Sequence, residues 1–236
     1  MSTGESPGRK PVGLSPARER WATFDCYGTL VDWNRGIGDE LEQLFGAAPV
    51  DLLVERYHEL EPLVQADDPS RSYREVLTLT LERLAAGEGL AIPAGEAGAL
   101  AQSLPTWPVF PEVSVALRQA RERGWRLCIL SNSDRDLIEG SIEAVGVHFD
   151  DAIVASEIGS YKPAHGHWSE FERRHGRLPD VHVAASLFHD IGPARELGLR
   201  SVWINRLREN AGEAVPTREL PDLSRLPNAL DELVSA

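Results

Sequence analysis

Two aspartates and one lysine stand out because each lies shortly after a buried apolar stretch of the sequence. Asp25 follows the first stretch directly, Lys162 stands a few residues beyond the third, and Asp190 lies six residues beyond the fourth. One carboxylate can act as a nucleophile, a second can activate water, and an ammonium group between them keeps both ionised. These residue types predict a hydrolytic site if the fold brings them together. The alternative for each is structural: such aspartates commonly form turns or cap helices, and lysines commonly lie on the surface.

Lys162 is unusual for this chain. Only two of its 24 cationic residues are lysines, and the other one, Lys10, lies near the N-terminus. A general preference for arginine leaves this exception unexplained. An ammonium group is a compact, titratable charge that fits where a planar guanidinium does not. The composition therefore favours a specific role for Lys162.

Short apolar stretches alternate with helical patterns through most of the chain. Stretches that are apolar on both faces and alternate with helices predict a parallel sheet covered on both sides, which is a Rossmann-like α/β fold. The predicted strands are residues 21–25, 126–130, 152–155, 181–184 and 201–204. Parallel strands end on one edge of the sheet, where ligands bind in such folds. Asp25, Lys162 and Asp190 are expected at that edge, together with Ser131 and Asn132.

The segment between the first and second predicted strands is helical. Its apolar residues have the spacing of amphipathic helices, and a proline-rich stretch at residues 104–111 ends the pattern. We expect an all-α cap domain at residues 37–106, inserted after the first strand. The core domain is then discontinuous, at residues 20–36 and 107–236. Residues 1–19 have no apolar period and are expected to form a disordered leader.

Composition excludes several classes of protein. No apolar run in the 236 residues approaches the roughly 18 to 20 residues of a membrane helix. The net charge of -13 would repel the phosphates of a nucleic acid. Cys26 and Cys128 are too few for a disulfide scaffold, and no secretory signal is evident. We therefore expect a cytoplasmic protein that acts on a small molecule and binds neither nucleic acid nor membrane.

Four motifs resemble, in order and on the predicted elements, those of the haloacid dehalogenase-like hydrolase superfamily. They are F-D-C-Y-G-T-L-V-D at 24–32, L-S-N at 130–132, S-Y-K-P at 160–163 and S-L-F-H-D-I at 186–191. The resemblance covers residues 21–210 and includes the inserted helical cap. It implies that Asp25 is the nucleophile, Lys162 the partner of both carboxylates and Asp190 the second acid. Thr29 and Ser131 become loop residues of the site.

Two positions within these motifs separate phosphatases from carbon–halogen hydrolases. Phosphatases of the superfamily carry a second aspartate two residues after the nucleophile, where this chain has Tyr27, and a magnesium-binding aspartate where it has Ala185. A halide leaves without protonation, whereas an alkoxide needs an acid. The chain thus resembles the 2-haloacid dehalogenase (type II) branch, which implies a metal-independent site without a cofactor. A magnesium-dependent phosphatase, a related carbon–nitrogen hydrolase and a non-catalytic binding protein are the alternatives.

The resemblance implies a reaction in two steps. Asp25 displaces halide from C2 of a 2-haloalkanoic acid, and water assisted by Asp190 then hydrolyses the aspartyl ester to a 2-hydroxy acid. The expected ligands are a small carboxylate substrate and a halide. Ser131 and Asn132 are expected to bind the carboxylate, with Tyr27 beside the substrate. Homodimers occur in the superfamily, and the acidic charge does not forbid an apolar interface.

Three further residues have both a functional and a structural interpretation. Arg56 stands where the branch has an arginine that closes over the substrate, or it is an exposed cap residue. Trp33 lines the cavity or packs at the junction of the cap. His189 donates a hydrogen bond near the halide or the water, or it packs beside the helix start. Leu187 replaces an asparagine that positions water in the best-known dehalogenases, so the water must have other partners here.

Overall fold

The computed structural model describes residues 18–46, 48–68 and 70–235. Most of the predicted leader, residues 1–17, lies outside the described residues, and Arg18 and Glu19 directly precede the first strand. In the described part of the chain, no helix combines the length and the apolar character needed to cross a membrane.

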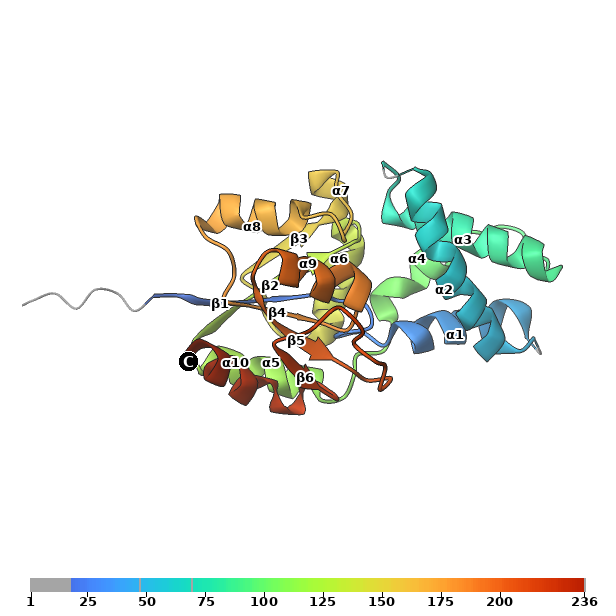
Figure 1. Cartoon of the computed structure of the whole chain (residues 1–236). Helices are drawn as coiled ribbons and strands as arrows, with labels where there is room; N and C mark the ends of the chain where they lie inside the picture. Colours follow the sequence, from blue (N-terminus) through green and yellow to red (C-terminus); the bar gives the residue numbers. More distant parts are fainter. Residues whose placement is uncertain (1–17, 47, 69, 236) are drawn as a thin grey trace, which may run out of the picture.

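All strands run parallel in one six-stranded sheet, in the order β3-β2-β1-β4-β5-β6 (Figure 1). The strands are β1 Arg20–Phe24, β2 Trp125–Ser131, β3 Asp151–Val154, β4 Val181–Ala184, β5 Arg200–Ile204 and β6 Arg218–Leu220. The predicted α/β class and its five strands are confirmed. The sixth strand has only three residues, which is too short for an alternating pattern to identify.

Helices cover both faces of the sheet, as its apolar strands require. Helices α5 and α10 pack together on one face, and α8 lies on the other (Figure 1). The helices around the sheet are α5 Val113–Glu122, α6 Arg135–Val145, α7 Ala155–Ile158, α8 Gly166–His175, α9 Gly192–Glu196 and α10 Leu226–Ser235. Several end at a glycine with positive φ, among them Gly146 and Gly176, which is a common way to terminate a helix.

Four helices between β1 and α5 form a separate group beside the sheet, which we call the helical insertion (Figure 1). They are α1 Trp33–Phe45, α2 Val50–Asp67, α3 Tyr73–Glu88 and α4 Ala99–Ser103. Helix α1 begins four residues before the expected boundary at 37, because the Asp32 side chain accepts a hydrogen bond from the Arg35 backbone and starts the helix there. Helix α3 begins with a capping box between Ser72 and Glu75.

The two segments that connect the helical insertion to the sheet run side by side. Val31 and Val109 form an antiparallel bridge, and the Asp32 N–H donates to the Pro108 carbonyl at 2.7 Å. The proline-rich stretch is therefore held by backbone hydrogen bonds to the outgoing segment. This pairing fixes where the insertion lies over the sheet edge.

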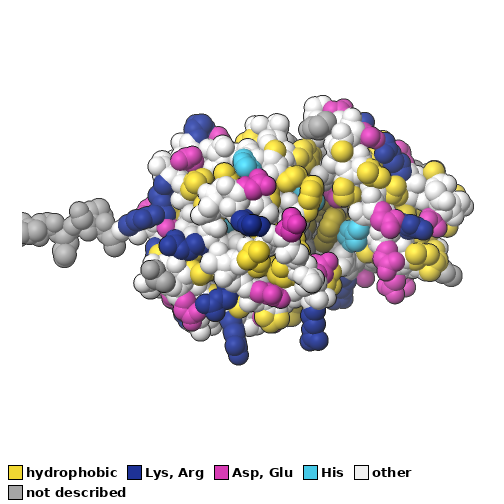
Figure 2. Space-filling model, viewed as in Figure 1, with side chains coloured by type: hydrophobic (Ala, Val, Ile, Leu, Met, Phe, Trp, Pro, Cys, Tyr) yellow, Lys and Arg dark blue, Asp and Glu magenta, His cyan; other side chains and the backbone are white. Residues whose placement is uncertain are grey.

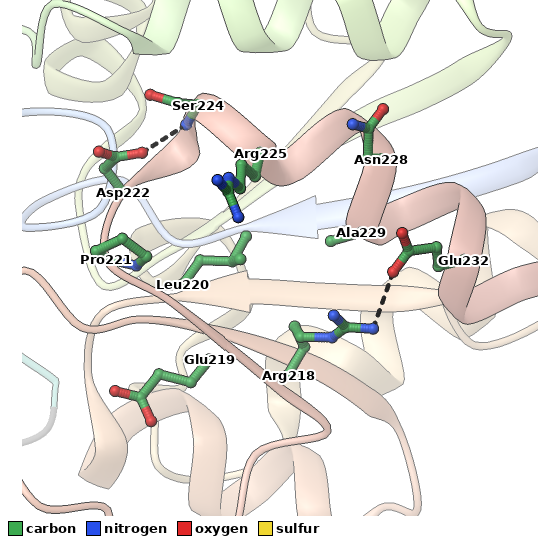
Figure 3. Close-up of a pocket in the computed structure, with 10 residues that line it drawn as sticks. All are labelled: Arg218, Glu219, Leu220, Pro221, Asp222, Ser224, Arg225, Asn228, Ala229 and Glu232. Carbon is green, nitrogen blue, oxygen red and sulfur yellow. Dashed lines mark hydrogen bonds and ion pairs between the residues drawn. The ribbon is translucent and has the colours of Figure 1, made fainter.

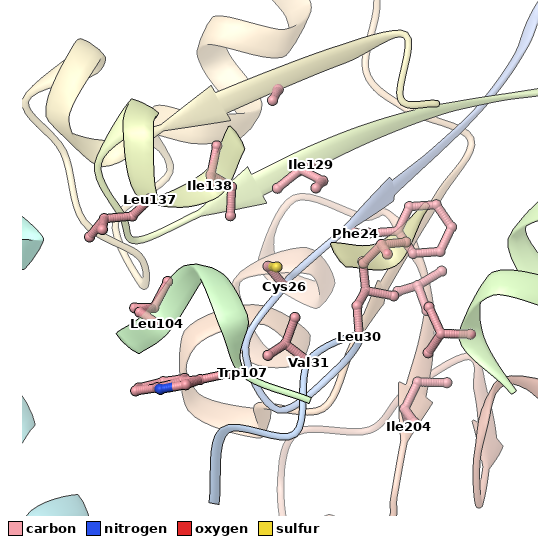
Figure 4. Close-up of a cluster of buried hydrophobic side chains, with 14 of the residues drawn as sticks. Phe24, Cys26, Leu30, Val31, Leu104, Trp107, Ile129, Leu137, Ile138 and Ile204 are labelled. Carbon is pink, nitrogen blue, oxygen red and sulfur yellow. The ribbon is translucent and has the colours of Figure 1, made fainter. Parts of the chain in front are cut away.

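One hydrophobic cluster extends from the sheet through these connections into the insertion (Figure 4). Its buried side chains include Phe24, Cys26, Leu30, Val31, Leu104, Trp107, Ile129, Leu137, Ile138 and Ile204. Burial of apolar side chains is the main favourable contribution to folding. Because sheet and insertion share this cluster, the polar residues between them are held by packing from both sides.

Gly36 offers a test of this packing. A Cβ atom at Gly36 would overlap the Trp107 ring, whereas one at Gly38 in the same helix would lie an ordinary 3.5 Å from Val50. We expect Gly36→Ala to lower the free energy of unfolding by about 1–3 kcal/mol through overpacking. Gly38→Ala should instead be neutral or stabilising by up to about 1 kcal/mol, since alanine favours the helix. Urea unfolding measures both, and equal effects at the two glycines would contradict the proposed packing.

Candidate active site

Three neighbouring strands bring the predicted residues to one edge of the sheet. Asp25 follows β1, Ser131 ends β2, and Asp190 lies in a π-helical turn after β4, while Lys162 comes from the loop before α8. They line a cavity of about 100 Å³, together with residues of the helical insertion. Its lining residues are Asp25, Tyr27, Trp33, Glu61, Gln65, Tyr73, Ser131, Asn132, Lys162, Ser186, His189 and Asp190. The surface is hollowed along the junction between the insertion and the sheet, with hydrophobic side chains on the walls (Figure 2).

The Lys162 ammonium lies at the centre of the site. It donates to Asp25 Oδ1 at 2.9 Å, to Asp190 Oδ1 at 2.6 Å and to the Leu130 carbonyl at 2.8 Å. These bonds use all three N–H donors of the group. Burial alone would lower the pKa of Lys162, but the two carboxylates hold it above its ordinary value. Lys162 is therefore charged, and it has no donor left for a substrate.

Asp25 is held at both carboxylate oxygens. Lys162 binds Oδ1, and the Thr29 hydroxyl donates to Oδ2 at 2.8 Å. Thr29 in turn accepts from the backbone N–H of Ala185 at 2.9 Å, so it lies behind Asp25 rather than in the cavity lining. Gly28, with φ of +83°, makes the turn that places Thr29 beneath the carboxylate. Burial raises the pKa of the Asp25 carboxyl.

Asp190 has a second buried partner that the sequence reasoning missed. His182 lies on β4, is fully buried, and its Nε2 is 3.0 Å from Asp190 Oδ1. Its Nδ1 is 2.9 Å from the Thr23 hydroxyl, which is consistent with Nε2–H donating to the carboxylate. Burial would raise the pKa of Asp190, but Lys162 and His182 hold it well below its ordinary value. The signal available in the sequence was a histidine within an otherwise apolar strand.

Ser131 and Asn132 differ in what their side chains offer to the cavity. The Asn132 side chain bonds the Lys162 backbone twice, donating to its carbonyl at 2.9 Å and accepting from its N–H at 2.6 Å. It therefore positions the Lys162 loop, and its amide is not free for a substrate. The Ser131 hydroxyl is buried and has no hydrogen-bond partner among the described residues. Ser131 is thus the available donor at the sheet edge.

Aromatic side chains form walls of the cavity. The Tyr27 and Tyr73 rings are stacked at 6.1 Å, and the Tyr27 hydroxyl is 3.2 Å from Ser141 Oγ. Trp33 lies against His58 at a ring distance of 4.4 Å, and its buried Nε1 has no partner within the described ranges. Trp33 therefore both packs and lines the cavity. Burial raises the pKa of Tyr27 far above its ordinary value, so its hydroxyl stays neutral.

His189 lines the cavity next to Asp190. Its backbone N–H donates to Ser186 Oγ at 3.0 Å, and its Nδ1 lies 3.2 Å from the same oxygen. Burial lowers the pKa of the His189 imidazole, which is therefore neutral near pH 7. This arrangement leaves Nε2 as the ring nitrogen for a further partner.

The structure does not bring Arg56 to the cavity. Arg56 lies on the exposed side of α2, where it pairs with Glu59 at 2.8 Å. The side of α2 that carries Tyr57, Glu61 and Val64 is buried instead, because α2 packs that side inward. The insertion therefore contributes a carboxylate to the cavity where an arginine was predicted.

Glu61 is the residue that the sequence reasoning missed entirely. It is only 3% exposed and accepts a hydrogen bond from the Gln65 side chain at 2.7 Å, one helical turn further along α2. Burial raises the pKa of the Glu61 carboxyl to about 7, although hydrogen bonds to Tyr73 and Gln65 favour its ionised form. No cation pairs with it in the described part of the chain. The only hint in the sequence was an acidic residue at an inward position of a helix.

The side chains do not fit a magnesium site of the phosphatase kind. Ala185 stands where such a site needs a carboxylate ligand, and Lys162 already bridges Asp25 and Asp190. Three or more His, Cys, Asp or Glu side chains suited to holding a metal ion are not found together in the described residues. A hard octahedral ion needs more oxygen ligands than this arrangement supplies.

A second hollow lies between β6 and α10 (Figure 3). Its lining shows surface ion pairing, such as Arg218 with Glu232 at 3.0 Å, and includes none of the residues described above. It contains no cluster of nucleophile, base and orienting group. The chemistry is therefore assigned to the cavity at Asp25.

Comparisons with known proteins show the family of the chain. Residues 20–184 match the haloacid dehalogenase-like hydrolase family. (S)-2-haloacid dehalogenase 1 of Pseudomonas sp. (strain CBS-3) is 27% identical over 219 residues, which cover 89% of this chain and 96% of that protein. Phosphoserine phosphatase of Thermus thermophilus is 31% identical over 122 residues, so the match spans only about half of each chain, 50% and 49%.

The fold also matches that of a solved structure. The L-2-haloacid dehalogenase from Xanthobacter autotrophicus with chloropropionic acid covalently bound superposes with a TM-score of 0.78. The match covers 91% of this chain and 99% of the other, at 18% identity. At this identity the likeness is one of fold.

Removing the Lys162 charge should destabilise the protein strongly. Lys162→Met leaves two buried carboxylates without their shared cation, so we expect a loss of about 3–5 kcal/mol in the free energy of unfolding. Arg83→Met is the matched control, because Arg83 pairs with Asp67 at the surface and should cost no more than about 1 kcal/mol. Urea unfolding at pH 7 compares the two. Similar losses would show that Lys162 does not hold the site together.

Glu61 should make stability depend on pH. Its carboxyl ionises at a lower pH in the unfolded chain than in the folded one, so stability falls as pH rises from the ordinary glutamate pKa to about 7. Glu61→Gln removes this loss, and its stability relative to the parent should grow by up to about 3 kcal/mol between pH 5 and pH 8. Glu59→Gln, on the exposed side of α2, is the control and should show no such trend. A constant difference between Glu61→Gln and the parent would contradict the buried carboxyl.

Proposed function

The chain belongs to the haloacid dehalogenase-like hydrolase family, and from this membership we propose that it hydrolyses carbon–halogen bonds of 2-haloalkanoic acids. The observation that carries the proposal is the Asp25 carboxylate, which lines a small cavity and is fixed by Lys162 and Thr29. No carboxylic acid stands two residues later, where Tyr27 lies. Such a site supplies a nucleophile without an acid for the leaving group, which suits a halide.

In the first step Asp25 attacks C2 of the substrate. A new bond forms between a carboxylate oxygen and C2, and the carbon–halogen bond breaks with its electron pair leaving on the halide. Attack from the side opposite the halide inverts C2. Lys162 and Thr29 favour the ionised form of the carboxylate, against the effect of burial, and orient it before the substrate binds.

In the second step water attacks the carbonyl carbon of the Asp25 ester. Esterification removes the charge of Asp25, and Lys162 then has Asp190 as its one remaining carboxylate partner. Asp190 is ionised and accepts the proton of the attacking water, while His182 and Lys162 hold it in place. The ester C–O bond breaks as the proton held by Asp190 passes to the departing alkoxide, which leaves as the 2-hydroxy acid. The other proton of the water is released to solvent, and both Asp25 and Asp190 are again carboxylates. Ser186 and His189 are the polar groups beside this water, in the region where Leu187 offers none.

We also propose the organisation and setting of the enzyme. The paired connections at Val31 and Val109 support a division into a cap domain at residues 37–106 and a core domain at residues 20–36 and 107–236. Cys26 and Cys128 are both buried as free thiols, which supports a cytoplasmic setting. The substrate is a small carboxylate that reaches the cavity between the two domains, and a homodimer stays a prediction.

Halide release tests the proposed reaction directly. In EDTA, the protein should release chloride from one enantiomer of 2-chloropropanoate, because no step requires a metal ion. Asp25→Asn should lower the rate at least about a thousand-fold, since it removes the nucleophile. Asp39→Asn, an exposed aspartate of α1, is the control. Absence of chloride together with magnesium-dependent release of phosphate from p-nitrophenyl phosphate would replace this proposal with a phosphatase.

Oxygen labelling distinguishes the ester route from direct attack of water on C2. With enzyme in excess over substrate in H₂¹⁸O, the first product should carry unlabelled oxygen from Asp25. The label should enter the Asp25 carboxylate, which peptide mass spectrometry locates. Label in the first product would exclude an aspartyl ester.

A further inference from the structure

The polar groups that line the cavity come from two parts of the fold. At the sheet edge are Asp25, the Lys162 ammonium and the buried Ser131 hydroxyl, which has no hydrogen-bond partner among the described residues. On the side of the helical insertion are Glu61 and Gln65, both on α2 and joined by a 2.7 Å hydrogen bond. A substrate attacked by Asp25 therefore lies between the strand ends, which include Ser131, and helix α2.

No cation among the described residues compensates Glu61. Lys162 is the only cationic residue among those that line the cavity, and its three donors are used by Asp25, Asp190 and the Leu130 carbonyl. Arg56 lies on the other side of α2. An ionised Glu61 thus adds a third carboxylate to a site with one ammonium group. Burying a carboxylate without a cation costs stability, and such residues are concentrated at functional sites.

A cation supplied by the substrate would complete this arrangement. The carboxylate end of a 2-haloacid has the Ser131 hydroxyl as its donor, whereas at the α2 end a second carboxylate or an apolar group would leave Glu61 uncompensated. An ammonium group there would form a charge-assisted hydrogen bond with Glu61. The small volume of the cavity, about 100 Å³, favours a short substrate.

We propose that Glu61 is a specificity-determining residue that selects small 2-haloacids carrying an ammonium group on the C2 substituent. This inference rests on the proposed function for the position of Asp25 at C2. Hydrogen bonds with Gln65 and Tyr73 hold the Glu61 carboxyl in place.

Two substrates that differ only in the substituent test the proposal. They are 2-chloropropanoate, with a methyl group on C2, and 3-amino-2-chloropropanoate, with an aminomethyl group. The parent enzyme should show a higher kcat/KM for the amino substrate. In Glu61→Gln the ratio of the two kcat/KM values should fall about 10- to 100-fold, the amount expected for loss of one charge-assisted bond. Glu59→Gln, on the exposed side of the same helix, should keep the ratio of the parent.

The outcomes separate this proposal from the reaction itself. If chloride is released from both substrates with a ratio that Glu61→Gln does not change, the role of Glu61 is overturned while the proposed function stands. If neither substrate releases chloride, the proposed function fails. A binding measurement then tests the role of Glu61 on its own. In that case calorimetry compares propanoate with 3-aminopropanoate on the Asp25→Asn protein, with and without Glu61→Gln. Tighter binding of 3-aminopropanoate that depends on Glu61 supports the proposal, and equal binding overturns it.

Discussion

Three hydrogen bonds from one ammonium group hold together the carboxyl ends of neighbouring strands. Lys162 contacts Asp25 after β1, the Leu130 carbonyl on β2 and Asp190 after β4, all within 2.6 to 2.9 Å. Breaking such a buried pair leaves uncompensated charge in a medium of low dielectric. The cavity therefore has its geometry only while this cation is in place. The position of the Lys162 loop depends in turn on Asn132, whose amide binds the Lys162 backbone on both sides.

This constraint explains why a lysine occurs here in a chain that otherwise uses arginine. A guanidinium is wide and planar and carries five donors, whereas the space between the two carboxylates and the Leu130 carbonyl offers three acceptors around a point. Lys162 is the only lysine among the described residues. The need for a compact cation with three acceptors around it thus accounts for the lysine at position 162. The composition of the sequence alone indicated that this position is special.

The residues at the sheet edge were predictable because the topology of a parallel sheet determines where its strands end. Parallel strands end on one side, so Asp25, Ser131 and Asp190 had to converge whatever the detailed packing. The side of the cavity formed by α2 was not predictable in this way. Which residues of a helix face inward depends on its rotation, and α2 carries polar residues at both Arg56 and Glu61, with Pro62 inside the helix. The role of His182 was not predictable for another reason. The apolar pattern of a strand does not show that a buried imidazole within it contacts a carboxylate behind the site.

The two sides of the cavity also differ in what they demand of a substrate. At the sheet edge one ammonium group, that of Lys162, is shared by the carboxylates of Asp25 and Asp190. All three of its N–H donors are used without any ligand. On the α2 side Glu61 is buried and hydrogen-bonded with Tyr73 and Gln65, but it has no cation as a partner among the described residues. A residue that costs folding energy and contributes no contact to the reacting carboxylate is best explained by what binds against it. In the proposed enzyme, chemistry and selectivity are therefore separated: the strand ends supply the reacting groups, and the inserted helix selects the substrate.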